Sequence, residues 1–219
     1  MPTINVNRQG RIGGVSNSNF STARTSDSGT ATDGVSGNAN VQFFDGRGAN
    51  RFTRVFLHFD TSGITSTLSA AHIDVAGGGT SPDPNDTIMI KSTAFGGDGG
   101  TAVATSDMFS SLDYSTRYSS ELTTWSTSGN NEYTLTSDAL ADIKNNDHFT
   151  LAIINHDADY ANTDTGATDD VTIDFNTTIT LDYTAVSGYT HDVNSVAAAS
   201  IGKVNTVATA SIGKINSVD

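Results

Sequence analysis

The sequence contains no cysteine, which excludes disulfide bonds, cysteine-ligated zinc sites and thiol-based catalysis. Basic residues are also scarce: 11 lysines and arginines stand against 24 aspartates and glutamates, giving a formal net charge of -13. Because contacts with nucleic-acid phosphates need Lys and Arg side chains, this charge disfavours nucleic-acid binding. No run of 18 apolar residues occurs, so we expect no transmembrane helix and no membrane insertion.

Strong helix formers are few as well, since the sequence has only two glutamates and four lysines. In their place stand 25 serines, 32 threonines and 21 glycines. Threonine favours strands, whereas glycine and serine favour turns, so the composition predicts an all-β protein with polar loops. The first four residues begin neither a basic nor an apolar segment, and we therefore expect no secretory signal peptide.

Apolar runs separated by turn residues predict seven or more strands between residues 41 and 185. The strongest is 52–60, whose apolar run is typical of a central strand. Since no long helices alternate with these strands, we predict an antiparallel jelly-roll β-sandwich with two short helices. The other expected strands are 41–44, 70–76, 87–91, 132–135, 149–155 and 171–183, and the expected helices are 106–112 and 137–144.

Three segments differ in character and suggest a domain organisation. Residues 1–40 are rich in Gly, Ser and Asn, and we expect them to form an extended N-terminal arm. Such an arm is either flexible or pairs with the sheet edge of a neighbouring subunit, with Ile4 and Val6 as its apolar contacts. Residues 41–185 form the predicted sandwich, and residues 186–219 form a separate tail.

The tail contains an internal repeat with a period of 11 residues. The segment 193–203 is followed by a near-identical copy at 204–214, and a third copy begins at 215. An 11-residue period suits a right-handed helical supercoil, whereas the glycines within it favour bent strands, and both interpretations stay open. In either form the apolar stripe needs a partner, so we predict an assembly element. Its candidate residues are Val193, Val196, Ile201, Val204, Val207, Ile212, Ile215 and Val218.

Aspartates gather after the expected strand 149–155. Alternating Asp and Asn oxygens in a loop suit Ca2+, a hard cation that takes six to eight oxygen ligands. The sequence predicts either a Ca2+ site here or a solvated acidic loop. The candidate ligands are Asp157, Asp159, Asp164, Asp169 and Asp170.

The only tryptophan, Trp125, lies near Tyr118 in the sequence. Exposed aromatic rings stack on sugars, so these two residues are candidates for glycan binding; the alternative is that they pack in the core. No nucleophile-elbow pattern Gly-x-Ser-x-Gly occurs, and nothing singles out a catalytic pair of aspartates. We therefore assign no catalytic residue and expect no enzymatic activity.

One stretch resembles a known family. Residues 54–64 read Arg-Val-Phe-Leu-His-Phe-Asp-Thr-Ser-Gly-Ile, and Ala-Ala-His-Ile-Asp-Val follows at 70–75. With the acidic segment 155–160, they resemble the DNRLP-type, carbohydrate-binding-module-like jelly roll of secreted bacterial proteins and phage virion proteins. The resemblance covers residues 41–185 and implies a jelly roll without catalytic residues of its own. The Ala-Ser-Ile-Gly-Lys-Val-Asn repeat resembles repeats at the ends of phage structural proteins.

These features lead to one hypothesis and two alternatives. The first is a non-enzymatic structural protein that self-assembles into a homo-oligomer or polymer, as a phage-type head decoration, fibre or tail component in contact with other virion proteins. Such a protein would be assembled in a host cytoplasm and found on the virion or an extracellular surface. The alternatives are a self-polymerising extracellular filament subunit and a glycan-binding adhesion module.

Overall fold

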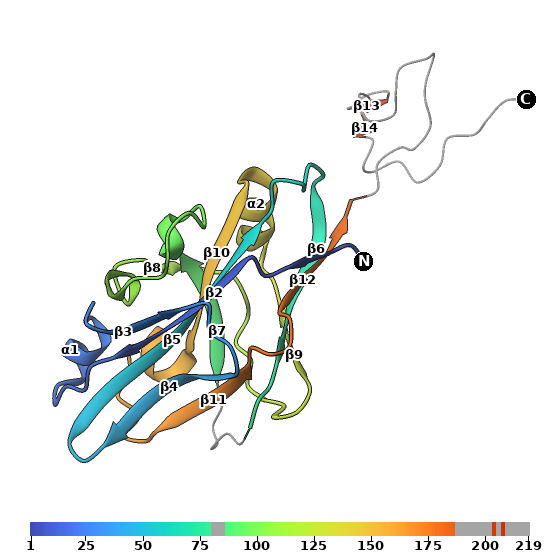
Figure 1. Ribbon diagram of the computed structural model, residues 1–219. Helices are drawn as coiled ribbons and strands as arrows, with labels where there is room; N and C mark the ends of the chain where they lie inside the picture. Colours follow the sequence, from blue (N-terminus) through green and yellow to red (C-terminus); the bar gives the residue numbers. More distant parts are fainter. Residues whose placement is uncertain (80–85, 187–202, 205–206, 209–219) are drawn as a thin grey trace, which may run out of the picture.

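The computed structural model describes residues 1–79, 86–186, 203–204 and 207–208. Residues 1–79 and 86–186 form two antiparallel sheets that face each other, so the predicted all-β sandwich is confirmed (Figure 1). The small sheet has four strands in the order β1 (Thr3–Asn5), β12 (Thr180–Ala185), β6 (Leu68–Ala76) and β9 (Asn130–Thr134).

The large sheet has eight strands. Six of them run in the order β11 (Asp169–Asp174), β4 (Asn38–Gly46), β5 (Ala49–Asp60), β10 (His148–Asn155), β7 (Thr87–Ser92) and β8 (Leu112–Arg117). Two more, β2 (Arg8–Gly14) and β3 (Gly29–Asp33), form a pair that joins the sheet through β2 and β5. Helical segments are short: α1 (Phe20–Arg24), α2 (Ser137–Asn145), and the turns Ala94–Gly96, Thr105–Asp107 and His156–Tyr160.

The large sheet is buried on both faces. On β5, Val55, Leu57 and Phe59 contribute to the core between the two sheets. Phe52 and Phe56 of the same strand contribute to a second core, which α1 and the segment between β7 and β8 cover. A strand buried on both faces has no polar side to present, which explains the continuous apolar run of β5.

The helix predicted at 137–144 is present as α2. The Thr136 side chain accepts a hydrogen bond from the amide of Ala139 at 3.3 Å, which caps the first turn. Ala139 and Ile143 bury one face of α2 in the core between the sheets. The helix predicted at 106–112 is wrong, because that stretch holds only a short turn before β8 begins at Leu112.

Residues 1–40 do not form an extended arm, contrary to the prediction. They contain β1, β2, α1, β3 and the start of β4, and the segment 8–13 of β2 pairs with β5 in the large sheet. The glycines of β2 made this segment look like a loop in the sequence. One of them, Gly10, is required because β2 packs closely against Val103. A Cβ atom on Gly10 would lie 2.6 Å from Cγ1 of Val103.

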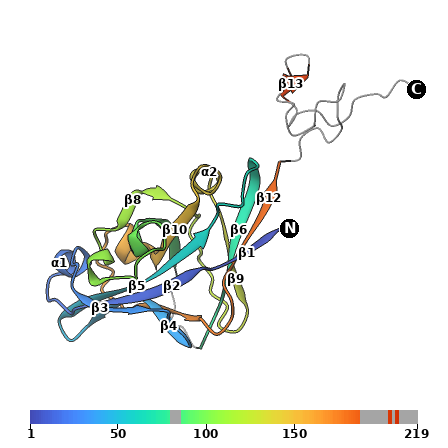
Figure 2. The same ribbon diagram turned by 45° about the horizontal axis from the view of Figure 1, so that its top comes forward.

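The first and last strands of the sandwich are neighbours. β1 pairs antiparallel with β12, with Thr3 opposite Asp182, and the two lie side by side in Figure 2. Beyond Val186, the described residues are the two-residue strands β13 (Lys203–Val204) and β14 (Val207–Ala208), which pair with each other. Of the two interpretations of the repeat, these four residues follow the strand form.

No helix in the described part of the chain is both long and apolar enough to cross a membrane.

Candidate functional site

The predicted Ca2+ ligands lie where β10 ends and β11 begins. The side chain of Asn155, the last residue of β10, organises this region. Its Oδ1 accepts a hydrogen bond from the amide of Ala158 at 2.7 Å, and its Nδ2 donates to Oδ2 of Asp169 and, at 3.3 Å, to the carbonyl oxygen of Asp86. This one side chain thereby connects the turn His156–Tyr160 with the segments before β7 and at the start of β11.

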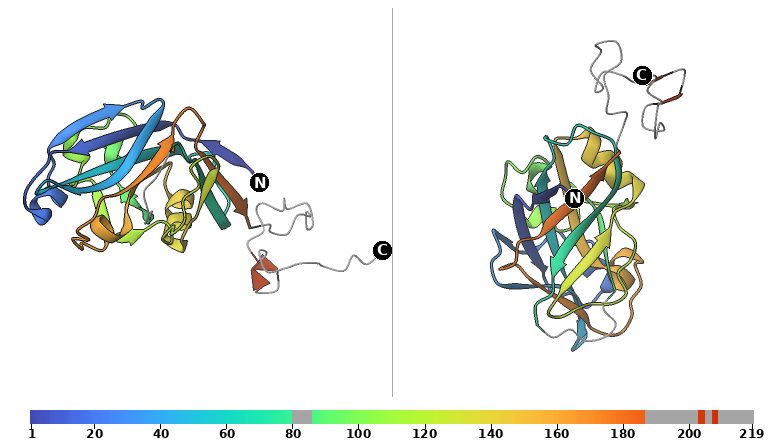
Figure 3. Two further views of the ribbon diagram at one scale, coloured as in Figure 1. Left: turned by 90° about the horizontal axis from the view of Figure 1, so that it is seen from below. Right: turned by 90° about the vertical axis from the view of Figure 1, so that its right-hand side faces the viewer.

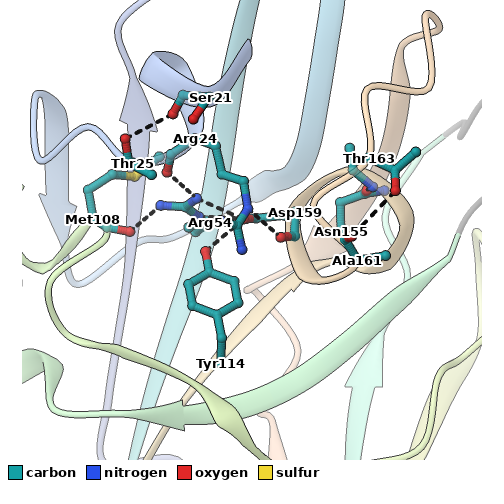
Figure 4. Close-up of polar contacts among 11 residues, drawn as sticks. Ser21, Arg24, Thr25, Arg54, Met108, Tyr114, Asn155, Asp159, Ala161 and Thr163 are labelled. Atoms are coloured by element: carbon teal, nitrogen blue, oxygen red, sulfur yellow. Dashed lines mark hydrogen bonds and ion pairs between the residues drawn. The ribbon is translucent and has the colours of Figure 1, made fainter.

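Asp159 is engaged in a buried ion pair with Arg54 (Figure 4). Nε and Nη2 of Arg54 donate to the two carboxylate oxygens of Asp159 at 2.6 and 2.8 Å. The Arg54 side chain is 0% exposed and that of Asp159 is 1% exposed. The hydroxyl of Tyr114 donates to the same carboxylate at 2.7 Å. With both oxygens occupied in this way, Asp159 is not available to a metal ion.

The remaining contacts of this pair bind distant segments together. Arg54 also donates to the carbonyl oxygens of Met108 and, at 2.8 Å, of Arg24 in α1. Arg24 in turn donates to the carbonyl oxygen of Asp159 at 2.6 Å and lies over the Tyr114 ring. Burial is the largest single cause and lowers the pKa of Arg54, but the charges of Asp159, Tyr114 and Asp27 and the hydrogen bond to Asp159 together hold this pKa above its usual value. We call Arg24, Arg54, Met108, Tyr114 and Asp159 the Arg54 cluster.

Asp169 and Asp170 point to opposite faces of β11, as successive residues of a strand do. Asp169 is 5% exposed, and its Oδ1 accepts no hydrogen bond from the described residues. Burial, which is the largest cause, together with the nearby charges of Asp86 and Asp157, raises the pKa of Asp169 to about 7. Burial also raises the pKa of Asp170 to about 6, although Asn40 donates a hydrogen bond to it.

Asp157 joins a different group. Nδ1 of His156 lies 3.0 Å from Oδ1 of Asp157 and 3.3 Å from Oε1 of Glu121. Backbone hydrogen bonds place Glu121 close to His156. Leu122 pairs with Thr87, and the amide of His156 donates to the carbonyl oxygen of Asp86, the residue before Thr87. The possible ligand atoms of the three residues lie within 4.8 Å of one another. A histidine nitrogen beside two carboxylates suits a first-row divalent cation better than Ca2+, which prefers oxygen ligands.

The five predicted ligands therefore do not form one site. Asp159 belongs to the Arg54 cluster, Asp170 lies on the other face of β11 from Asp169, and Asp164 is exposed in a turn where it accepts a hydrogen bond from the Gly166 amide. Only Asp157 and Asp169 remain near each other, close enough for the charge of one to affect the pKa of the other. Ca2+ binding stays a prediction, now limited to these two residues.

Sequence reasoning missed the partners that matter most here. Glu121 is separated from His156 by the whole of β9, α2 and β10, so no local spacing reveals the pair. Arg54 did carry a signal, because an arginine in the middle of an apolar strand needs a buried counter-charge. That signal could have pointed to an acidic partner but not to Asp159 in particular.

The residues predicted to bind glycans are packed against the core. Tyr118 is 2% exposed, and its hydroxyl donates a hydrogen bond to Oδ2 of Asp142. Trp125 is partly buried and packs against the core between the sheets. The buried Tyr118 ring is therefore no exposed platform for stacking on a sugar, whereas glycan binding through the partly exposed Trp125 stays a prediction.

We compared the chain with known proteins. No family model matches it. No curated protein matches it either.

The residues predicted to support assembly fall into three groups. Ile4 and Val6 are partly buried against the core between the sheets of their own chain, with Ile4 opposite Leu181 of β12, and a role for them in assembly stays a prediction. Val204 and Val207 lie opposite each other in β13 and β14. The other six lie outside the described residues: Val193, Val196, Ile201, Ile212, Ile215 and Val218.

Proposed function

We propose that this chain is a non-enzymatic structural protein that assembles through its C-terminal repeat and displays the β-sandwich, as a component of a phage-type virion. Copies join to one another through the apolar positions of the repeat. The same design serves a head decoration, a fibre or a tail component.

The observation that carries this proposal is the position of β12. This strand is held between β1 and β6, and the chain leaves the sandwich at its end, at the start of the tail 186–219 that contains the repeat. The β4–β5 hairpin and α1 lie at the opposite end of the sandwich (Figures 1 and 3). An attachment made through the repeat therefore leaves the hairpin end facing outward.

The described part of both cores lies within the sandwich. All described residues of both cores, including the partly buried ones, lie between Ile4 and Tyr183. An 11-residue repeat with apolar residues at fixed positions is a separate feature, which is too short to bury a core of its own. Contacts between copies give these apolar side chains a place to be buried.

The proposal is tested with two double variants of the full-length chain. Ile201→Asp with Ile212→Asp places charges at matching apolar positions of the two repeat copies, and it should convert the assembled protein into monomers. The matched control is Ser200→Asp with Ser211→Asp, which adds the same charge at the preceding polar positions and should leave assembly intact. Light scattering gives the mass, and negative-stain imaging distinguishes fibres from closed oligomers.

Three results would overturn the proposal. One is a wild-type protein that stays monomeric at all concentrations measured. Another is an isoleucine variant that assembles as the wild type does. A third is equal loss of assembly in both variants, since that would show a general effect of charge rather than burial of the apolar positions.

A further inference from the structure

A histidine and three carboxylates meet on the outer face of the small sheet. His72 and Asp74 come from β6, Asp182 from β12 and Glu132 from β9. In the register of the sheet, His72 lies opposite Asp182, and Asp74 lies opposite Glu132. Since side chains alternate along a strand, all four share the face opposite the core residue Ile73.

The distances place the imidazole at the centre of this group. Nε2 of His72 lies 3.9 Å from Oδ2 of Asp74, 3.9 Å from Oδ2 of Asp182 and 4.0 Å from Oε2 of Glu132. These separations are too long for hydrogen bonds. Four ligands placed about 2.1 Å from a tetrahedral cation lie about 3.4 Å apart. The ligand atoms of His72, Asp74 and Asp182 all lie within 4.8 Å of one another, so small side-chain adjustments would bring these three into a coordination shell. Glu132, which is more exposed, would have to swing in as the fourth ligand.

The group carries more negative charge than its histidine can balance. Burial, as the largest cause, and the neighbouring Glu132 and Asp182 raise the pKa of Asp74, whereas His72 acts in the opposite direction. Three carboxylates around a single imidazole leave net negative charge even when the imidazole is protonated. A divalent cation between them would remove this repulsion.

The surrounding structure holds the ligands in place. The hydroxyls of Thr3 and Thr180 donate to the two carboxylate oxygens of Asp182, the latter at 3.2 Å. Hydrogen bonds of this kind to a carboxylate ligand orient it toward the metal and are a regular part of metal sites. Ile73 and Leu181 pair across β6 and β12 and are fully buried, which fixes the backbone beneath.

We propose that His72, Asp74, Asp182 and Glu132 bind one first-row divalent cation, for which Zn2+ is the probe. One nitrogen and three carboxylate oxygens form a donor set that Zn2+ accepts. The bound cation joins β6, β9 and β12 across the outer face of the small sheet. This site is separate from the group of Glu121, His156 and Asp157, which provides its internal control.

The test is isothermal titration of ZnCl2 into tag-free, full-length protein that has been treated with a chelator and dialysed. Loss of an outer-shell partner typically weakens metal binding 10- to 100-fold, so loss of the central ligand should cost at least about 100-fold. His72→Gln should therefore lose the site. Glu132→Gln removes the most exposed ligand, whose side chain is 60% exposed, and should weaken binding about tenfold without disturbing the fold.

The matched control is His156→Gln, which removes the histidine of the other group and should retain the His72 site. Substituting Co2+ for Zn2+ adds an optical readout, because four-coordinate Co2+ absorbs strongly in the visible. The part of this band that comes from the His72 site should vanish in His72→Gln and persist in His156→Gln. Wild-type protein that binds no Zn2+ would overturn the proposal. So would binding that survives in His72→Gln and is lost in His156→Gln.

Discussion

The Arg54 cluster offers a sharp test of how the second core is held. Asp159→Asn keeps the shape of the side chain but removes the negative charge facing Arg54. The guanidinium would then be buried without a directly bonded counter-charge, since its side chain is 0% exposed and its other hydrogen-bond partners are carbonyl oxygens of Met108 and Arg24. The more distant Asp27 carboxylate is a smaller influence on Arg54 than Asp159 is. Breaking a buried pair by neutralising one partner costs about 3–5 kcal/mol, and we expect a loss of that size.

The reverse change should cost less. Arg54→Met leaves Asp159 with a second cation, because Nε of Arg24 lies 3.6 Å from Oδ1 of Asp159, and with the hydrogen bond from Tyr114. In Arg54→Met the buried charge of Asp159 is therefore still partly balanced. In Asp159→Asn the buried charge of Arg54 loses its bonded partner. The double variant Arg54→Met with Asp159→Asn removes both charges and should be more stable than Asp159→Asn alone.

Urea unfolding is the assay, followed by the fluorescence of Trp125, the only tryptophan, which packs against the core between the sheets. Far-UV circular dichroism provides a second probe, whose coincidence with fluorescence tests two-state behaviour. For a domain of this size, a loss of 3–5 kcal/mol lowers Tm by about 6–20 °C. The reasoning would be refuted if the free energy of unfolding of Asp159→Asn were within about 1 kcal/mol of wild type. It would also be refuted if the losses in the two single variants simply added in the double variant.

Two further predictions concern the stability of the sandwich. The pKa of Asp169 is about 7 in the folded protein, against 3.8 for an aspartate exposed to water. Between about pH 4 and pH 7, Asp169 is therefore protonated in the native state and ionised in the unfolded chain. Stability should thus fall as the pH rises through this window. The free energy of unfolding in urea should differ less between pH 5 and pH 8 in Asp169→Asn than in the wild type. An unchanged difference would contradict the raised pKa of Asp169. Gly77→Ala should cost about 1–3 kcal/mol, because the added Cβ would lie 1.8 Å from the carbonyl oxygen of Ser126. Gly63→Ala, where no atom lies within 4 Å of the added Cβ, is its control, and equal losses would show that crowding is not the cause.

The sequence pattern predicted the strands that bury apolar side chains. The runs at 52–60 and 149–155 became β5 and β10, which lie side by side at the centre of the large sheet. It failed for β2, where Gly10, Gly13 and Gly14 read as a loop although the strand is paired on both sides. The pattern of apolar residues reports which side chains are buried, but not backbone pairing or close packing. A strand rich in glycine therefore cannot be recognised from that pattern.

The candidate site was less predictable for a geometric reason. Asp157 and Asp159 are two residues apart, yet the turn that contains them directs one toward His156 and the other toward Arg54. Asp169 and Asp170 are adjacent, and strand alternation separates them completely. Proximity in sequence therefore did not mean convergence in space. The groups that do converge also draw residues from strands or turns far apart in the chain, such as Glu121 with His156 and Asp182 with His72.

The pairing of β12 has a mechanical consequence. If the protein is anchored through its C-terminal repeat, any pulling force enters the sandwich along the axis of β12. Hydrogen bonds to β1 and β6 flank this strand on both sides, so they are loaded together in shear rather than opened one after another. Resistance to such a force depends on the rate of unfolding. Here the force acts on β12, which is paired on both sides, and not on a strand at the edge of the sheet.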